Sequence, residues 1–387
     1  MVGASLAGLQ AARSLRSQGF DGRLVIIGDE QHRPYDRPPL SKELLAGKVG
    51  TDSLLLEDTD DALDAEWLLG TPASSLDTLG RAVVLANGSR VRSDGIVIAT
   101  GARARTLPGP GPRAGVHVLR TLDDALSLRD ELVAGSRLVV IGAGFIGAEV
   151  ASTARALGCA VTVVEAMPTP LAGPLGAEMG AIVSGLHEQH GARLICGVGV
   201  DRLVGRERVE AVELTDGTSL PADVVVVGIG ALPNVEWLAG SGVALANGVE
   251  CDHAGRTSVP GVVAVGDCAS WHDMRRGRSH RVEHWTGALE RPLTAVMSLL
   301  SGSAFADTAS KPTSIPYFWS DQYDVRIQFA GNAADADSVV VEAGSAETQD
   351  VLAVYRRGEE PVAVLGMCQP RLFGRWRRQL NAAPVPA

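Results

Sequence analysis

Two short segments of this 387-residue sequence place small residues where a backbone could approach a phosphate group closely. Residues 3–8 read Gly-Ala-Ser-Leu-Ala-Gly, and residues 142–147 repeat the pattern as Gly-Ala-Gly-Phe-Ile-Gly. Between a strand and a helix, the first glycine allows a tight turn, the second admits a pyrophosphate, and the third lets helix and strand pack closely. The free N–H groups of the helix N-terminus also favour an anion. The repeat therefore predicts two dinucleotide sites.

Acidic residues follow both segments where a carboxylate could bind a ribose. An alanine-rich helical pattern ends at Gly19 in the first copy and at Gly158 in the second, and a β-branched run comes next. The first run ends in Asp29 and Glu30, and the second run ends in Glu165. A carboxylate at this position accepts hydrogen bonds from ribose hydroxyls and repels a 2′-phosphate, so we expect NADH rather than NADPH at the second site.

Three further segments have the composition of buried strands that run into a turn. They are Ile96–Gly101, Val224–Gly230 and Val262–Ala269, the last of which places Asp267 at its carboxyl end. Each alone would be an ordinary core strand, but ligands of open α/β sheets bind at the carboxyl ends of strands. The expected fold class is therefore α/β, with two Rossmann-like dinucleotide-binding domains.

The first copy of the repeat departs from the usual pattern in two ways. Ser5 replaces the middle glycine, and only Met1 and Val2 precede Gly3. A central strand normally needs about five residues. We therefore expect a first strand that is cut short, with either a start upstream of Met1 or a weak centre of the sheet.

The composition excludes several classes of protein. The net charge of −10 argues against a general binder of nucleic acid or anionic membranes. The longest apolar stretches are too short for a membrane span of about 20 residues, and no basic region of a signal peptide precedes them. The cysteines are widely spaced, which argues against a cysteine metal site and favours free thiols in a cytoplasmic protein. They are Cys159, Cys196, Cys251, Cys268 and Cys368.

The whole chain resembles the FAD-dependent, NADH-using ferredoxin reductases of oxygenase systems. The resemblance rests on residues 33–42 (Arg-Pro-Tyr-Asp-Arg-Pro-Pro-Leu-Ser-Lys), 119–125, 228–230, 283–285 (Glu-His-Trp) and 316–323 (Pro-Tyr-Phe-Trp-Ser-Asp-Gln-Tyr). It implies an FAD domain, an inserted NADH domain and a C-terminal α+β domain that covers the flavin. The implied boundaries are 1–107 with 232–308, then 108–231, then 309–387.

The resemblance also implies roles for individual residues. Lys42 would lie beside the flavin and pair with Glu149, two residues after Gly147, and this cation would favour the reduced, anionic flavin. A solvated lysine and an ordinary helical glutamate are the plainer alternative. Asp267 would meet the ribitol chain and Trp285 a cofactor ring. Together, the motifs and the resemblance give these expected cofactor-binding residues: Gly3, Ser5, Ala7, Gly8, Asp29, Glu30, Arg37, Lys42, Ala73, Ala99, Thr100, Gly101, Arg120, Gly142, Gly144, Gly147, Glu165, Gly228, Gly230, Asp267 and Trp285.

The implied activity is the transfer of electrons from NADH through FAD, one at a time, to a small ferredoxin that feeds a monooxygenase or dioxygenase. The alternatives are an NADH oxidase and a non-enzymatic, NADH-responsive flavoprotein similar to apoptosis-inducing factor. No cysteine precedes Cys159, so the thiol relay of disulfide reductases is not expected. The ferredoxin would dock transiently on arginines, in a protein that is a monomer or a weak dimer. Two arginine groups are candidates for the docking face: Arg275, Arg276, Arg278 and Arg281; and Arg371, Arg375, Arg377 and Arg378.

Overall fold

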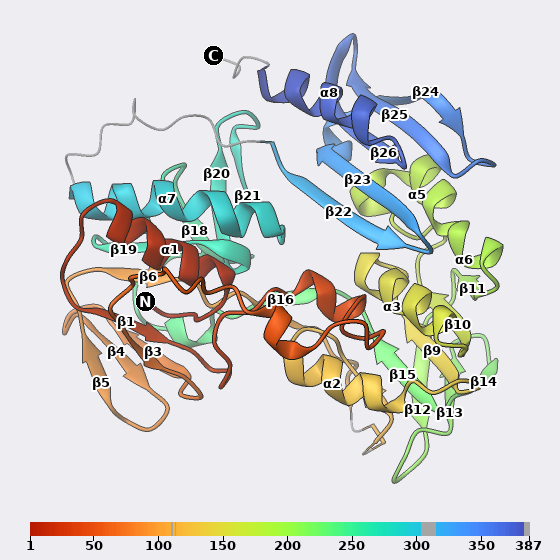
Figure 1. The fold of residues 1–387 in the computed structure, drawn as a ribbon, viewed down its shortest axis with the longest axis horizontal. Coiled ribbons are helices and arrows are strands. Elements are labelled where there is room, and N and C mark those ends of the chain that lie inside the picture. Colours follow the sequence, from red (N-terminus) through yellow and green to blue (C-terminus); the bar gives the residue numbers. More distant parts are fainter. Residues whose placement is uncertain (110, 113, 303–314, 383–387) are drawn as a thin grey trace.

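Three units, each centred on a sheet, make up the part of the chain that the computed structural model describes, residues 1–109, 111–112, 114–302 and 315–382 (Figure 1). Two of the sheets are parallel and the third is antiparallel, so the expected α/β class with a C-terminal α+β domain is confirmed. The expected boundary between residues 308 and 309 lies outside the described residues. Among the described residues, no helix is both long and apolar enough to cross a membrane.

The first unit is built on a parallel sheet in which Val2 takes the central position. The strands lie in the order β2, β1, Val2, β6 and β19, because Val2 bridges Ile27 on one side and Ile98 on the other. Val2 is buried, and its backbone N–H donates to the Val97 carbonyl at 2.9 Å. Among the described residues, the first strand thus consists of Val2 alone, with a bridge on each side. The bounds are β1 (Leu24–Ile27), β2 (Ala65–Leu68), β6 (Ile96–Ile98) and β19 (Val262–Ala264).

Helices and a second sheet enclose the parallel sheet of the first unit in one apolar core (Figure 1). The helices are α1 (Leu6–Ser17) and α7 (Trp285–Ser301), and the second sheet holds β3 (Ala73–Asp77), β4 (Ala82–Leu85) and β5 (Arg90–Arg92). The smaller elements are η1 (Pro38–Ser41), η2 (Thr51–Leu54), β7 (Ala102–Ala104), β16 (Ala231–Pro233), η3 (Glu236–Leu238), β17 (Leu245–Ala246), β18 (Gly248–Cys251), η4 (Gly266–Cys268), β20 (Ala269–Asp273) and β21 (Arg278–Arg281).

The second unit repeats this layering, with helices and strands that lie between Val116 and Val227. Its parallel sheet has the order β11, β10, β9, β15 and β8. One face packs on α2 and α3, and the other on the small sheet β12–β13–β14. The bounds are β8 (Val116–His117), α2 (Leu122–Glu131), β9 (Arg137–Ile141), α3 (Phe145–Ala156), β10 (Ala160–Glu165), β11 (Arg193–Cys196), β12 (Val200–Val204), β13 (Ala211–Leu214), β14 (Ser219–Pro221) and β15 (Val224–Val227).

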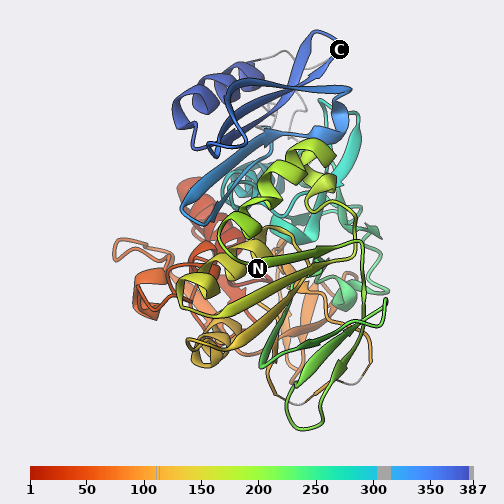
Figure 2. The same ribbon diagram turned by 90° about the vertical axis from the view of Figure 1, so that its right-hand side faces the viewer.

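The C-terminal unit is an antiparallel sheet in the order β22, β23, β26, β25 and β24, covered on one face by α8 (Figure 2). Its other face packs on three short helices of the second unit, α4, α5 and α6, so the two units share an apolar core. The bounds are α4 (Ala172–Leu175), α5 (Ala177–Ser184), α6 (Leu186–Gln189), β22 (Tyr317–Gln322), β23 (Val325–Gly331), η7 (Ala333–Asp335), β24 (Ser338–Ser345), β25 (Asp350–Arg357), β26 (Glu360–Met367) and α8 (Pro370–Ala382).

Candidate functional site

The two glycine-rich loops have the same local geometry. Gly3 has a φ of 120°, and a Cβ there would lie 2.0 Å from the carbonyl oxygen of Ala99. Gly142 has a φ of 99°, and a Cβ there would lie 2.3 Å from the carbonyl oxygen of Gly228. Any side chain would therefore be strained and would clash with backbone. Each loop turns tightly against the end of a neighbouring strand, as the repeat predicts.

The middle position of each loop leaves room for a ligand at the start of a helix. A Cβ at Gly144 would meet no atom within 4 Å, so the loop before α3 is open. Ser5 takes the same place before α1, and Arg37 Nε donates to its hydroxyl at 3.3 Å. Neither helix has a side-chain cap, so first-turn N–H groups remain for an anion. A pyrophosphate fits both loops, and at Ser5 an arginine would assist.

A cavity of about 1270 Å³ connects the two loops and continues to β22 of the C-terminal unit. Its size and its two open helix N-termini fit a pair of dinucleotides. Most of the expected cofactor-binding residues line it: Gly3, Ser5, Ala7, Asp29, Glu30, Arg37, Lys42, Ala73, Ala99, Thr100, Gly101, Arg120, Gly144, Gly228, Gly230, Asp267 and Trp285.

The remaining expected residues do not line the cavity; they are Gly8, Gly142, Gly147 and Glu165. Cβ atoms at Gly8 and Gly147 would lie 2.0 and 2.2 Å from the carbonyl oxygens of Gly3 and Gly142, so these glycines permit close helix packing. Glu165 ends β10, and its carboxylate accepts the N–H groups of Ala143 and Met167, both at 2.9 Å. This carboxylate is thereby fixed beside the second loop.

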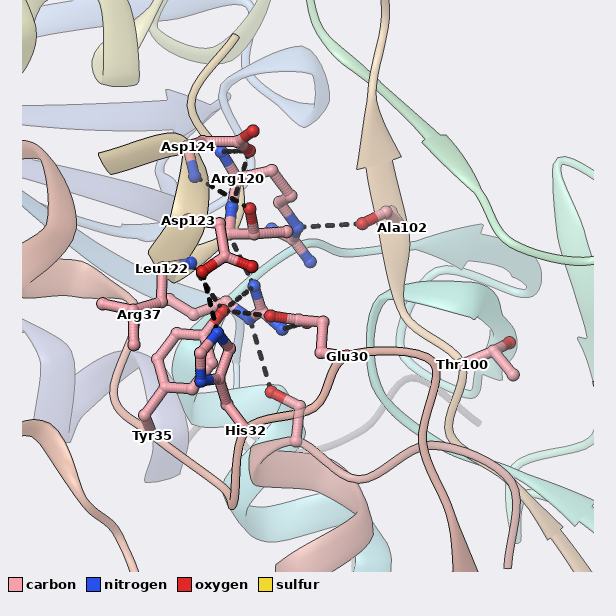
Figure 3. Close-up of polar contacts among 12 residues, drawn as sticks. Glu30, His32, Tyr35, Arg37, Thr100, Ala102, Arg120, Leu122, Asp123 and Asp124 are labelled. Carbon is pink, nitrogen blue, oxygen red and sulfur yellow. Dashed lines mark hydrogen bonds and ion pairs between the residues drawn. The ribbon is translucent and has the colours of Figure 1, made fainter. Parts of the chain in front are cut away.

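Arg37 joins the first loop to the segment that leads into α2 (Figure 3). Its guanidinium donates to Glu30 at 2.6 Å, to the Tyr35 hydroxyl at 2.9 Å and to the carbonyl of Arg120 at 2.6 Å. Burial raises the pKa of Tyr35, so its hydroxyl stays protonated and also accepts the N–H of Leu122 at 2.9 Å. Glu30 is thus neutralised by Arg37 rather than left as a free carboxylate.

Arg120 and Asp267 face each other across the part of the cavity that belongs to the first unit. Their ion pair measures 2.7 Å, and Arg120 Nε also donates to the carbonyl of Ala102 at 2.8 Å. Asp267 lies in η4, directly after β19, which is the position expected for a ligand-binding acid. Both side chains are partly buried, so their charges interact more strongly than at an open surface.

Lys42 and Glu149 lie together where the first and second units meet. Lys42 Nζ is 2.9 Å from Glu149 Oε2, with side chains that are 13% and 8% exposed. A buried carboxylate normally needs a partner charge and hydrogen-bond donors, and Lys42 supplies the charge. The geometry excludes the plainer alternative of a solvated lysine.

Aromatic side chains form the cavity wall on the side of the C-terminal unit. Trp285 Nε1 donates to Asp36 Oδ1 at 2.8 Å, and its ring lies edge-on to Trp319, with centroids 5.8 Å apart. Burial raises the pKa of Asp36, although this bond and Lys42 oppose the shift. His284 precedes Trp285, and burial lowers its pKa to about 4.

Sequence reasoning gave no cofactor-binding or catalytic role to Ser41, Asp36, Trp319 or Ser320, although each contacts an expected site residue. Ser41 and Ser320 both donate to Glu149. All four lie within residues 33–42 and 316–323, segments that already carried the resemblance. Their presence in those segments was the available signal, but only the fold shows which atoms they bind.

The two arginine groups differ in solvent exposure and in the ion pairs that they form. In the first group, Arg276 pairs with Asp335 at 2.8 Å and Arg278 with the same carboxylate at 3.2 Å. These contacts tie the β20–β21 hairpin to the C-terminal unit. The side chain of Arg281 is 9% exposed and pairs with Glu283 at 2.5 Å, so the expectation that this group forms an open docking face is wrong for Arg276 and Arg281.

On α8, by contrast, the arginines at positions 371, 375 and 378 are exposed and share one side of the helix. Within the described residues none of these three forms an ion pair. The fourth, Arg377, lies over the Tyr317 ring, 3.9 Å from its centroid. Arg371, Arg375 and Arg378 are called the α8 arginine face below.

Two known protein families together match nearly the whole chain. Residues 1–291 match the family described as pyridine nucleotide-disulphide oxidoreductase, and residues 317–386 match the one described as reductase C-terminal.

Individual proteins and structures are similar over most of their length. Rhodocoxin reductase of Rhodococcus erythropolis is 39% identical, over 88% of this chain and 79% of that protein. The ferredoxin–NAD(+) reductase subunit of the benzene 1,2-dioxygenase system of Pseudomonas putida is 38% identical, over 86% and 80%. A crystal structure of the covalent putidaredoxin reductase–putidaredoxin complex superposes with a TM-score of 0.93 at 34% identity, over 98% and 92% of the two chains.

Proposed function

Since the chain belongs to the pyridine nucleotide-disulphide oxidoreductase family and also carries a reductase C-terminal region, we propose that it is an NADH:ferredoxin reductase. FAD, when bound, supplies the chemistry of accepting a hydride from NADH and releasing two electrons singly to an iron–sulfur ferredoxin of an oxygenase system. One observation carries the proposal: a single cavity is reached by both glycine-rich loops and is bordered by the Lys42–Glu149 ion pair.

We assign FAD to the first unit on the chemistry of its donors. The open N-terminus of α1, with Ser5 and Arg37 beside it, suits a pyrophosphate. Asp267 at the carboxyl end of β19 offers an acceptor for the hydroxyls of the ribitol chain. Arg120 holds that carboxylate in place through its ion pair at 2.7 Å.

We assign NADH to the second unit, where α3 begins at Gly144. Glu165 is held by two backbone N–H groups of its surroundings and presents a negative charge beside the loop. That charge accepts ribose hydroxyls and repels a 2′-phosphate. The two residues that follow it, Ala166 and Met167, offer no cation that could compensate.

Lys42 and Glu149 are the residues that we propose to act at the reacting centre. Lys42 keeps a positive charge in a partly buried wall, where Coulomb interactions are stronger than in bulk water. Negative charge that arrives in the cavity with a hydride is stabilised there. Glu149 fixes the position of the Lys42 ammonium group and balances its positive charge before the hydride is transferred.

We propose that the ferredoxin docks on the side of the C-terminal unit. The α8 arginine face supports this because it concentrates positive charge in a protein of net charge −10. Electron-transfer complexes are small and transient, so such charges act mainly on the association rate. A cytoplasmic location is also proposed, supported by five cysteines that are all free of disulfides.

Anaerobic titration of the FAD-loaded protein with NADH tests the proposal against its two alternatives. We expect the flavin absorbance to bleach with one equivalent of NADH and to recover when an oxidised iron–sulfur ferredoxin is added. If the flavin absorbance recovers when oxygen is added, but does not recover with any ferredoxin of a broad panel, the protein would be an NADH oxidase. A long-lived charge-transfer band with slow bleaching would indicate an NADH-responsive flavoprotein without an electron-transfer partner.

A further inference from the structure

The Glu149 carboxylate is held by four donors rather than by Lys42 alone. Its Oε2 atom accepts the Ser41 hydroxyl at 2.5 Å and the Lys42 ammonium group at 2.9 Å. Its Oε1 atom accepts the Ser320 hydroxyl at 2.7 Å and the Asp321 N–H at 3.3 Å. Each oxygen is therefore fixed separately, so the carboxylate cannot rotate about its terminal bond without losing donors on both sides.

These donors come from different units of the protein. Ser41 ends η1 in the first unit, Glu149 lies on α3 in the second, and Ser320 lies on β22 in the C-terminal unit. Ser320 is fully buried, and Gln322 Nε2 donates to its oxygen at 3.0 Å. Because that bond occupies a lone pair of the hydroxyl, the hydroxyl proton is directed to Glu149. Thr153 on α3 fixes the other side by donating to the Ser41 carbonyl at 2.8 Å.

Strand β22 also borders the cavity through Trp319, the residue before Ser320. Ser320 contacts Glu149 on α3, while the neighbouring Trp319 lines the cavity. Trp319 lies edge-on to Trp285 there. One strand of the C-terminal unit thus contacts both the residue pair that borders the cavity and its aromatic wall.

We propose that Ser41 and Ser320 are positioning residues, which hold Glu149 against Lys42. The rate of hydride transfer from NADH then depends on how the C-terminal unit packs on α3. The inference rests on the proposed function, because the step that it affects is the transfer from NADH. Without Ser320, Oε1 keeps only the 3.3 Å bond from Asp321. A buried carboxylate that lacks a donor turns toward water or another donor, and Lys42 moves with it.

The test compares two serines that both bridge α3 and the C-terminal unit. Ser320→Ala removes a donor to Glu149. Ser152→Ala is the matched control: its hydroxyl accepts the Tyr323 N–H at 2.7 Å, but among the described residues it forms no hydrogen bond with Glu149 and does not line the cavity. Each variant is made in the parent and in a Glu149→Gln background. Ser41→Ala provides a second variant on the opposite oxygen.

Three quantities are measured: the rate of flavin reduction at saturating NADH, the visible spectrum of the oxidised protein, and the midpoint of thermal unfolding. We expect Ser320→Ala and Ser41→Ala to slow reduction by about tenfold, the effect of one lost hydrogen bond to a charged group. We expect the flavin spectrum of both variants to be shifted. For Ser152→Ala we expect a rate of flavin reduction within about twofold of the parental rate. In the Glu149→Gln background, Ser320→Ala should have little further effect on the rate, because the charge that the hydroxyl positions is already absent.

The proposal is overturned if Ser320→Ala reduces at the parental rate with the parental spectrum. It is also overturned if Ser152→Ala slows reduction as much, since a general loosening of the unit would then be the cause, or if the effect of Ser320→Ala persists in Glu149→Gln. These outcomes differ from a failure of the proposed function, in which the parent protein itself would not be reduced by NADH or would reduce no ferredoxin.

Discussion

At the scale of single residues, the cation of Lys42 and the anion of Glu149 depend on each other because both are largely withdrawn from water. Removal of either one leaves the other charge buried and unpaired, which costs more than the pair itself contributes. The effects of the two changes should therefore not add.

We expect Lys42→Met to slow flavin reduction by NADH by roughly tenfold or more while the fold stays intact, because the charge that stabilises the reduced state is lost. Glu149→Gln should slow the same step. Stopped-flow reduction of the two single variants and the double variant forms the cycle. Additive losses in the double variant would contradict the contact, since residues that act as a pair couple.

A buried histidine gives the stability of the protein a defined pH dependence. His187 bonds through Nδ1 to the Tyr323 hydroxyl at 2.8 Å at the joint between α6 and the C-terminal unit, and burial lowers its pKa to about 4 from an ordinary value of 6.5. Between these values the unfolded chain binds the proton and the folded chain does not. The free energy of unfolding should therefore fall as the pH falls from 6.5 toward 4, by up to about 1.4 kcal/mol per pH unit from this group.

Urea unfolding at pH 7 and pH 5 measures this dependence. We expect His187→Gln to be less stable than the parent at pH 7 but to lose less stability at pH 5. His272→Gln, a change at an exposed histidine of β20, is the control and should keep the parental pH dependence. A His187→Gln protein with the full parental loss would show that this histidine is not the source.

At the scale of elements, the sequence was most informative where one element is repeated. The glycine segments predicted α1 and α3, and the β-branched runs predicted β1, β10, β6, β15 and β19, because tight turns and buried strands leave local compositional marks. The domain boundaries drawn from the resemblance stay a prediction, although all strands of the second parallel sheet lie within 108–231.

Contacts between distant parts of the chain left no such signal in the sequence. The sequence predicted a shortened first strand, but not that Val2 bridges Ile27 and Ile98. The pairing of Arg276 with Asp335 depends on how the β20–β21 hairpin meets η7, and a local charge run cannot reveal that distant partner. For the same reason the four donors to Glu149 could not be deduced from spacing.

The end of β10 should decide which nicotinamide cofactor is used. We expect a higher kcat/KM for NADH than for NADPH, because Glu165 repels a 2′-phosphate. Glu165→Gln keeps an acceptor for the N–H of Ala143 but loses the charge, so it should narrow the preference by roughly tenfold. Steady-state kinetics with both nucleotides measure this. An unchanged ratio in the variant, or equal use of both by the parent, would contradict the assignment.

At the scale of the whole molecule, the cavity is bounded by all three units, so the proposed cofactors and partner meet where no single unit is complete. The α8 arginine face lies on the unit that also contributes Trp319 to the cavity wall. Long-range attraction by this face should bring an acidic ferredoxin to that side of the protein.

Salt should therefore weaken ferredoxin turnover while leaving ferricyanide reduction nearly unchanged, because screening shortens from roughly 10 Å at 0.1 M to about 3 Å at 1 M. Replacing Arg371, Arg375 and Arg378 by Ala should raise the apparent KM for ferredoxin several-fold at low salt and flatten its salt dependence. A control with equal charge change replaces Arg92, Arg105 and Arg206, which are exposed elsewhere. Equal effects of both triple variants would mean that net charge, and not this face, steers the ferredoxin.

The central claim is that electrons from NADH leave this protein singly, to an iron–sulfur ferredoxin. The most direct measurement mixes the FAD-loaded protein anaerobically with a limiting amount of NADH and an excess of oxidised ferredoxin, with putidaredoxin among those tried, and follows flavin and ferredoxin absorbance together. We expect two ferredoxins to be reduced for each NADH consumed, at a rate that Lys42→Met slows. A flavin that bleaches while every ferredoxin stays oxidised would contradict it.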